Sequence, residues 1–247
     1  MSTENPSFPC ILPAGDSAAL IRFGGELDFD INAAVLEFDQ YLSTTSIDGV
    51  TETSPALVSL LVRFDPLKIS YDLLEVQLQQ LLGVKDWLLK PVIKDPAHWK
   101  IPVCYGGDAG EDLAGVAEML GISETDVIEQ HCESLLRVLT LGFAPGCAYL
   151  GMLPPHWNIP RLKVIKPRVP SGAILVALRQ TVMPSAPMPT GWRCIGRSPM
   201  NNFNAQCIPP VFVKHGDTVQ YTPVSPREFD RLQLQQQSGE SVIEQVA

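Results

Sequence analysis

Apolar residues in the first hundred positions recur at two spacings, one typical of strands and the other typical of helices. Short apolar runs predict strands, and apolar residues three or four positions apart predict helices that bury one face. Six segments follow one another in the order β-α-β-β-α-β: residues 18–23, 31–42, 49–53, 56–64, 71–82 and 98–104. This order is typical of the split βαβ arrangement of ferredoxin-like sandwiches.

The pattern changes after residue 104. Residues 105–133 combine a glycine-rich loop with two short helical segments, the second opened by Ser123 and Asp126 in a loose capping box. From Ser134 onward, short apolar runs separated by glycine and proline predict the many strands of a barrel or sandwich. We therefore expect an α+β protein with a ferredoxin-like α/β domain over residues 10–97, a β-barrel domain over 98–228 and a flexible polar tail over 229–247.

Charge and composition exclude several classes of function. The net charge is -9 and no basic run is present, which argues against a nucleic-acid partner. No apolar segment approaches the roughly 20 residues that span a bilayer, so we expect no membrane partner. The first ten residues have neither the basic start nor the apolar core of a signal peptide, so we expect a cytoplasmic protein.

The chain also lacks the common cofactor and metal motifs. It contains no P-loop, no dinucleotide-binding GxGxxG, no HExxH and no GxSxG. The six cysteines are scattered, which predicts reduced thiols, and the four histidines are too far apart in sequence to suggest a metal centre.

Glycine, proline, arginine and tryptophan are concentrated between residues 142 and 199, where they alternate with short apolar runs. The turn GFAPGCAYLG permits two interpretations. Its backbone N–H groups could cradle an anion or a carbonyl oxygen, or its glycines could merely relieve crowding at a barrel corner. Cys147 in this turn has no activating neighbour in the sequence and is expected to be a small packed residue.

Four further residues of interest carry two interpretations each. Arg161, Arg168 and Arg197 lie on turns rich in proline or glycine, where a planar guanidinium suits an acidic ligand but could equally form surface ion pairs. His131 ends a predicted helix, where it is either a helix cap or a general acid or base at a pocket edge. The acidic cluster Asp108, Glu111 and Asp112 is explained by a helix start. Trp192 is expected to plug the barrel.

A series of short motifs carries a family resemblance in its order along the chain. The residues are Gly142-Phe143-Ala144-Pro145-Gly146, Tyr149-Leu150-Gly151, Pro160-Arg161, Val169-Pro170-Ser171-Gly172, Gln180-Thr181, Gly191-Trp192 and Ile195-Gly196-Arg197-Ser198-Pro199. They resemble the allophanate hydrolase subunit 1 family, also described as carboxyltransferase domain, subdomains C and D, with its pattern GFxPGFxYLxxLP, PR, VPAGSV, QTGIYP, PGGW and IGRTP. Residues 52–66 and His131 also match, so the resemblance covers roughly residues 10 to 225.

The resemblance implies a cyclophilin-like β-barrel as the second domain and a pocket shared with a partner chain. The family includes the B-type subunit of the ATP-dependent 5-oxoprolinase, a Kip-type kinase inhibitor and part of urea carboxylase. A B-type subunit of an ATP-dependent amidohydrolase is implied first, using ATP through a complex with a C-type or allophanate hydrolase subunit 2-type protein. Its substrate would be a small cyclic amide or a urea-derived molecule. A non-catalytic Kip-type regulator and a carboxyltransferase component of a biotin-dependent carboxylase stay open as alternatives.

The resemblance also implies roles for individual residues. His131 is the candidate for proton transfer, the turn at residues 142–146 would supply main-chain donors, and three side chains would hold an anionic substrate or phosphorylated intermediate. The candidate substrate-binding residues are Gly142, Phe143, Pro145, Gly146, Tyr149, Arg161, Arg168, Gln180, Trp192 and Arg197, of which Arg161, Gln180 and Arg197 would hold the anion.

The chain departs from the family pattern at several positions in this segment. Cys147 replaces an aromatic residue, Met183 stands where tyrosine is usual, and Thr190 replaces a glycine. Lys166 stands at the position of a second Pro-Arg arginine, with Arg168 two residues later. Because these changes fall within the candidate pocket, they bear on the activity and not on the fold.

Overall fold

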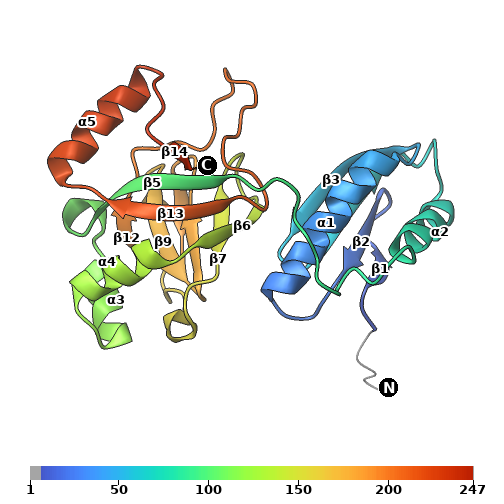
Figure 1. Cartoon of the computed structure of the whole chain (residues 1–247), viewed down its shortest axis with the longest axis horizontal. Coiled ribbons are helices and arrows are strands. Elements are labelled where there is room, and N and C mark those ends of the chain that lie inside the picture. The colour runs from blue at the N-terminus through green and yellow to red at the C-terminus, as the bar shows by residue number, and fades with distance from the viewer. Residues whose placement is uncertain (1–6, 247) are drawn as a thin grey trace. The chain divides into compact units, whose positions relative to one another are not determined.

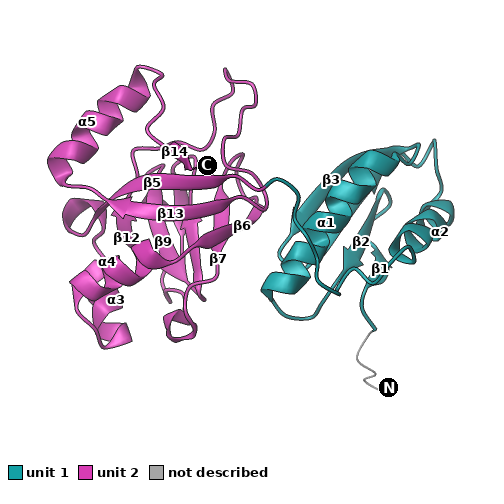
Figure 2. Cartoon of the chain, in the orientation of Figure 1, with its two compact units in different colours: residues 1–95 teal, residues 96–247 magenta. Residues whose placement is uncertain are grey.

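The structure, a computed structural model, describes residues 7–246 and divides into two compact units, residues 1–95 and 96–247 (Figure 2). Each unit has its own hydrophobic core. The division after Asp95 lies close to the expected end of the first domain at residue 97.

The first unit is a four-stranded antiparallel sheet with two helices. Its elements are β1 (Cys10–Pro13), β2 (Ala18–Arg22), α1 (Phe29–Thr45), β3 (Val50–Ala56), β4 (Ser59–Phe64) and α2 (Tyr71–Leu82). Hydrogen bonds from the amides of Asp30 and Ile31 to the Asp28 carboxylate start α1, and the Ser70 hydroxyl starts α2. Both helices turn apolar residues toward the sheet, including Phe38, Leu74 and Leu78.

The split βαβ arrangement is present, but the strand expected to complete it belongs elsewhere. The sheet order is β1-β2-β4-β3, so β2 and β3 run parallel with the antiparallel β4 between them and α1 connecting them. The outer position beside β2 is occupied by the N-terminal β1, whose Ile11 pairs with Ile21. Residues 98–104 instead form a strand of the second unit, so they do not complete the β-α-β-β-α-β order in the first sheet but lie in the domain that was expected to begin at residue 98.

The second unit is built on a closed seven-stranded barrel with short helices around it (Figure 1). Its strands are β5 (His98–Tyr105), β6 (Leu136–Leu141), β7 (Ala148–Gly151), β8 (Lys166–Val169), β9 (Ala173–Ala177), β10 (Gln180–Met183), β11 (Met188–Thr190), β12 (Arg193–Arg197), β13 (Thr218–Pro223) and β14 (Glu244–Val246). The barrel order is β12-β9-β10-β7-β6-β13-β5, and pairing of Arg197 with Cys104 closes the ring between β12 and β5. This architecture confirms the expected α+β fold class.

Alternation along the barrel strands separates an inner core from an outer one. On β9, Ile174 and Val176 point into the barrel, whereas Ala173, Leu175 and Ala177 lie in a cluster on its outer face. The two-stranded ribbon of β8 and β11 contributes Val169 and Met188 to this outer cluster. The candidate turn and Trp192 both belong to the outer cluster, so the barrel wall carries them on its outer surface.

The helices of the second unit are η1 (Gly107–Ala109), α3 (Leu113–Leu120), α4 (Glu124–Glu133), η2 (Pro155–Trp157) and α5 (Pro226–Gln237). The flexible tail expected after residue 228 is not observed. Residues 229–237 belong to α5, which is started by the Ser225 hydroxyl and anchored by the buried Phe229 and Leu232, and β14 then pairs with β5. Two apolar anchors in a glutamine-rich stretch are too few to signal a helix from composition, whereas the Ser-Pro start is a cap signal.

Candidate functional site

The glycine-rich turn between β6 and β7 presents free main-chain donors. Phe143 and Gly146 adopt positive φ angles of 70° and 73°. The Gly142 amide donates to the Cys147 carbonyl and the Cys147 amide to the Ala144 carbonyl, both at 3.0 Å. Within the described residues, the amides of Phe143, Ala144 and Gly146 make no hydrogen bond. Gly146 is buried, so Phe143 and Ala144 are the residues whose amides can donate to an oxygen atom from outside.

The same turn is also a crowded corner. The Pro145 carbonyl accepts from the Ser185 hydroxyl, and the Gly146 carbonyl accepts from the Asn202 amide at 3.0 Å. A Cβ atom at Gly146 would lie 2.8 Å from the Cβ of Phe203. Both interpretations of this turn therefore apply, since its carbonyls anchor it to the unit while the amides of Phe143 and Ala144 have no partner among the described residues.

An aromatic and arginine cluster adjoins the turn on the outer face of the barrel. The Tyr149 and Trp192 rings meet edge to face at 6.1 Å, and the Arg161 guanidinium lies 5.4 Å from the Trp192 ring centre. Burial raises the pKa of the Tyr149 hydroxyl, and the charge of Arg161 partly offsets this effect. Cys147 and Ala144 of the turn pack in the same cluster. The structure thus brings together the turn, Tyr149, Trp192 and Arg161.

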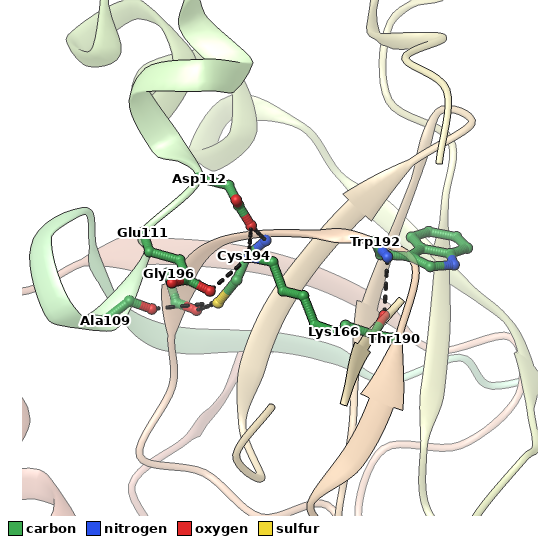
Figure 3. A network of polar contacts seen from close by, with 8 residues as sticks. All are labelled: Ala109, Glu111, Asp112, Lys166, Thr190, Trp192, Cys194 and Gly196. Carbon is green, nitrogen blue, oxygen red and sulfur yellow. Dashed lines mark hydrogen bonds and ion pairs between the residues drawn. The ribbon is translucent and has the colours of Figure 1, made fainter. Parts of the chain in front are cut away.

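Two departures from the family pattern fit this environment. Thr190 is buried, and its hydroxyl accepts a hydrogen bond from the backbone amide of Trp192 at 3.0 Å (Figure 3). This bond fixes the backbone that carries the indole. Cys147 is fully buried, and burial raises the pKa of its thiol to about 11. A neutral, buried thiol is a packing residue and not a nucleophile.

Arg197 lies at the far end of β12 from Trp192, against α5. Its guanidinium faces the Phe229 ring at 5.6 Å, and its Nε donates to the Ser171 carbonyl at 3.4 Å. It lines two cavities, one of about 510 Å³ beside η1 and one of about 370 Å³ beside Asn201 and Gln233. The predicted substrate-binding arginines therefore do not converge, because Arg161 and Arg197 belong to different surfaces of the barrel.

His131 lies inside the barrel and not at a pocket edge. Its Nδ1 is 2.7 Å from the Tyr105 hydroxyl, its Nε2 is 2.9 Å from the Thr181 hydroxyl, and its ring stacks on Tyr221 at 4.8 Å. Burial lowers the pKa of His131 to about 3, so the imidazole is neutral. Neither the helix cap nor the accessible acid or base expected from the sequence describes this residue, which is a hydrogen-bonded core histidine.

Two other predicted residues belong neither to the cluster around Trp192 nor to the cavities beside Arg197. Gln180 is buried on β10, where the neighbouring Thr181 points into the barrel, and its side chain therefore faces outward. Arg168 is exposed on β8.

One polar network was not predicted as a unit from the sequence. The Lys166 Nζ donates to Glu111 at 2.6 Å and to Asp112, whose carboxylate also accepts the Cys194 amide at 2.6 Å (Figure 3). The Asp112 amide in turn donates to the Cys194 carbonyl at 2.9 Å. Asp112 therefore ties the start of α3 to β8 and β12, between Trp192 and Arg197. The available signals were the acidic cluster and the lysine at the arginine position of the family pattern.

Replacing Asp112 with asparagine should destabilise the second unit by roughly 1–3 kcal/mol, because two charge-assisted hydrogen bonds lose their acceptor charge. Glu111→Gln is the matched control, since the only ion pair of this exposed residue among the described residues is with Lys166, and the change should alter stability by less than about 0.5 kcal/mol. Urea unfolding followed by tryptophan fluorescence measures both. Equal losses in the two variants would contradict the anchoring role of Asp112.

Two other kinds of feature are absent from the part of the chain that the structure describes. Among the described residues, no helix is both long and apolar enough to cross a bilayer. Residues 7–246 also contain no cluster of three or more potential metal-ligating histidine, cysteine or acidic side chains.

Comparison with known proteins identifies the family. The model of the carboxyltransferase domain, subdomain C and D, matches residues 9–213. The B subunit of the 5-oxoprolinase of Bacillus subtilis is 32% identical over 222 residues, which are 87% of this chain and 92% of that protein.

Solved structures agree with this assignment. The crystal structure of TTHA0988 superposes with a TM-score of 0.73 at 30% identity, over 84% of this chain and 40% of that longer chain. The Kluyveromyces lactis urea carboxylase shares the fold with a TM-score of 0.77 at 18% identity, over 96% of this chain and 24% of that chain. On the motif order, the barrel and these matches, the chain belongs to the carboxyltransferase domain, subdomain C and D, family.

Proposed function

We propose that this chain is the B-type subunit of an ATP-dependent amidohydrolase that acts on 5-oxoproline together with a C-type partner protein. The observation that carries the proposal is the similarity to the B subunit of the Bacillus subtilis 5-oxoprolinase, which extends over 92% of that relative. Similarity over nearly the whole length of a relative supports a shared role better than a match to one motif.

The Trp192 cluster, which comprises Trp192, Tyr149, Arg161 and the turn at residues 142–146, suits an amide substrate that also carries a carboxylate. The unpaired amides of Phe143 and Ala144 can bind the amide carbonyl oxygen and stabilise negative charge as it develops there. Arg161 can form a paired hydrogen bond with the carboxylate, and the Trp192 ring below it holds the guanidinium in place. Tyr149 packs against Trp192 and forms part of the floor.

The proton-transfer group is not His131. Its two nitrogens are already within hydrogen-bond distance of Tyr105 and Thr181, and its ring is fully buried. A general acid or base must reach the reacting atom directly or through one water molecule. We therefore assign proton transfer to a group of the partner chain or to water.

ATP does not fit the charge of the cavity of about 510 Å³ beside η1. That cavity has Arg197 as its cation and two carboxylates, Asp108 and Asp230, on its rim. A triphosphate carries several negative charges and is normally held by backbone amides with lysine, arginine or a metal ion. We therefore place ATP on the assembled complex and route no step through a nucleotide on this chain.

Mixing this chain with the C-type protein of the same organism should give ATP hydrolysis that depends on 5-oxoproline. Arg161→Ala should lower turnover by about 10- to 100-fold, because a hydrogen-bonded charge pair to the substrate contributes roughly 1.5–3 kcal/mol. Arg227→Ala, on exposed α5, is the matched control for loss of one arginine. Coupled measurement of ADP release reports both.

Absence of 5-oxoproline-dependent ATP hydrolysis with the C-type partner would contradict the proposed activity. Full activity in the Arg161→Ala variant would instead contradict the assigned binding cluster.

A non-catalytic regulatory role is the second candidate. Burial of His131 favours it, because the chain then lacks the proton-transfer group that the family resemblance implied. Affinity capture distinguishes the two roles, since recovery of a kinase in place of a C-type partner supports regulation. Recovery of a biotinylated protein would support the carboxyltransferase alternative.

A further inference from the structure

The cavity of about 510 Å³ between η1, β5, β12 and α5 has no role in the proposed cluster around Trp192. Its charged side chains come from Arg197 on β12, Asp108 on η1 and Asp230 on α5. We propose that it binds a small zwitterion, a molecule with a carboxylate and an ammonium group, and specifically the amino acid released when the lactam is opened. The choice of amino acid rests on the proposed function.

Arg197 is positioned but not neutralised. Pairing with Cys104 fixes its backbone at the point where the barrel closes, and the Phe229 ring holds its guanidinium at 5.6 Å. The guanidinium makes one hydrogen bond in the described structure, from Nε to the Ser171 carbonyl at 3.4 Å, and no described carboxylate forms an ion pair with it. The two terminal nitrogens are therefore open to a carboxylate ligand, which guanidinium groups bind in a bidentate manner.

The glycine loop beside Arg197 adds a main-chain donor. Gly106 and Gly107 line the cavity with φ angles of 70° and 52°, a conformation that side chains disfavour. The Gly106 amide donates to the Ile195 carbonyl at 3.1 Å, whereas the Gly107 amide has no acceptor among the described residues. A carboxylate at Arg197 thus has a neighbouring N–H group on the cavity wall.

Two carboxylates on the rim make the cavity unsuitable for a plain anion. Asp108 and Asp230 stand on different elements, and both are exposed. Burial raises the pKa of the Cys104 thiol, and the charge of Asp230 raises it further, so Asp230 lies near the residue paired with Arg197. One cation and two anions around one space attract a ligand that offers a carboxylate to Arg197 and an ammonium group to the rim.

Amide hydrolysis creates such a ligand from one that lacks the ammonium. In 5-oxoproline the nitrogen is part of an uncharged amide, and the single charge is a carboxylate. Water adds to the carbonyl carbon, the C–N bond breaks, the carbonyl becomes a second carboxylate, and the released nitrogen takes up protons to become ammonium. The product is glutamate, so the Arg197 cavity would recognise the product while the Trp192 cluster would hold the substrate.

Isothermal titration of the full chain, without ATP or partner, tests this with L-glutamate, glutarate and 5-oxoproline as probes. Glutarate has the same two carboxylates but no ammonium group. We expect glutamate to bind at least 10-fold more tightly than glutarate or 5-oxoproline. Arg197→Gln should weaken glutamate binding by 10-fold or more, and Asp230→Asn should remove the preference for glutamate over glutarate. Arg227→Gln on the same helix is the control and should change nothing.

Equal binding of glutamate and glutarate, or unchanged glutamate binding in Arg197→Gln, would overturn the proposal. If Arg197→Gln fails to fold because it borders the barrel closure, the exposed Asp230→Asn still decides the question. The titration measures binding and is independent of the turnover assay of the complex. If this chain binds glutamate but the complex is inactive, the result counts against the proposed function alone. An active complex in which this chain binds no glutamate would count against this cavity alone.

Discussion

Alanine at position 110 should destabilise the second unit by about 3 kcal/mol or more, an effect at the upper end for overpacking. A Cβ atom on Gly110 would overlap the Ile195 carbonyl and lie 2.7 Å from the Gly196 nitrogen. Both atoms are backbone of β12, which pairs with β9 and β5, so neither can move without opening the barrel. The close approach also aligns the bonds between Asp112 and Cys194.

Gly115→Ala is the matched control for this substitution. Gly115 lies within α3, and an added Cβ would meet no atom within 4 Å. Alanine in a helix interior should therefore stabilise the unit by about 0.5–1 kcal/mol. Urea denaturation midpoints followed by far-UV circular dichroism measure both variants. A similar shift in both would mean that the contact between Gly110 and β12 does not constrain the barrel.

The second unit should lose stability as the pH falls below about 6.5. Burial lowers the pKa of His131 from 6.5 to about 3 and that of His215 to about 4. In the unfolded chain both histidines take up a proton near pH 6.5, whereas the folded unit keeps them neutral. Stability is therefore complete above pH 6.5 and falls by about 1.4 kcal/mol per pH unit for each histidine, until the folded-state pKa is reached.

The hydrogen bonds agree with neutral rings. The Leu141 amide donates to Nε2 of His215 at 3.0 Å, so that nitrogen must be unprotonated. Denaturant unfolding at pH 7 and pH 5 measures the change, and the carbon chemical shifts of the imidazoles report their protonation directly. His156→Gln alters an exposed histidine and should leave the pH dependence intact. Protonation of either buried ring at pH 5.5 in the folded protein would contradict the prediction.

The order of helices and strands could be predicted from periodicity, but the sheet to which each strand belongs could not. Residues 98–105 have the pattern of a buried strand in either unit, and only their partners β12, β13 and β14 place them in the barrel. β1 was missed because it is short and ends at Pro13. α5 was missed because its many glutamines resemble those of a tail, although its Ser-Pro start was visible.

In the candidate site, too, the sequence predicted local features better than contacts between distant segments. Of the candidate residues that the resemblance implied, the turn, Tyr149, Arg161 and Trp192 lie together on one side of the barrel wall, whereas Arg168, Gln180 and Arg197 lie elsewhere. The position of His131 at the end of a predicted helix suggested a cap or a group at a pocket edge, because helix position alone does not show which way a ring points. The ion pair of Lys166 with Asp112 spans 54 residues, and no local pattern connects the two.

The way in which the barrel closes bears on its synthesis. β5 begins at residue 98, but the strands that flank it end at residues 197, 223 and 246. On the ribosome, β5 must therefore wait with both edges unpaired and with Ile101 and Val103 uncovered, while the first unit is already complete at residue 95. At typical rates of about 5–20 residues per second this wait lasts roughly 10 s, long enough for a chaperone to hold the nascent strand. The first unit can thus fold during translation, before the strands that complete the barrel have been made.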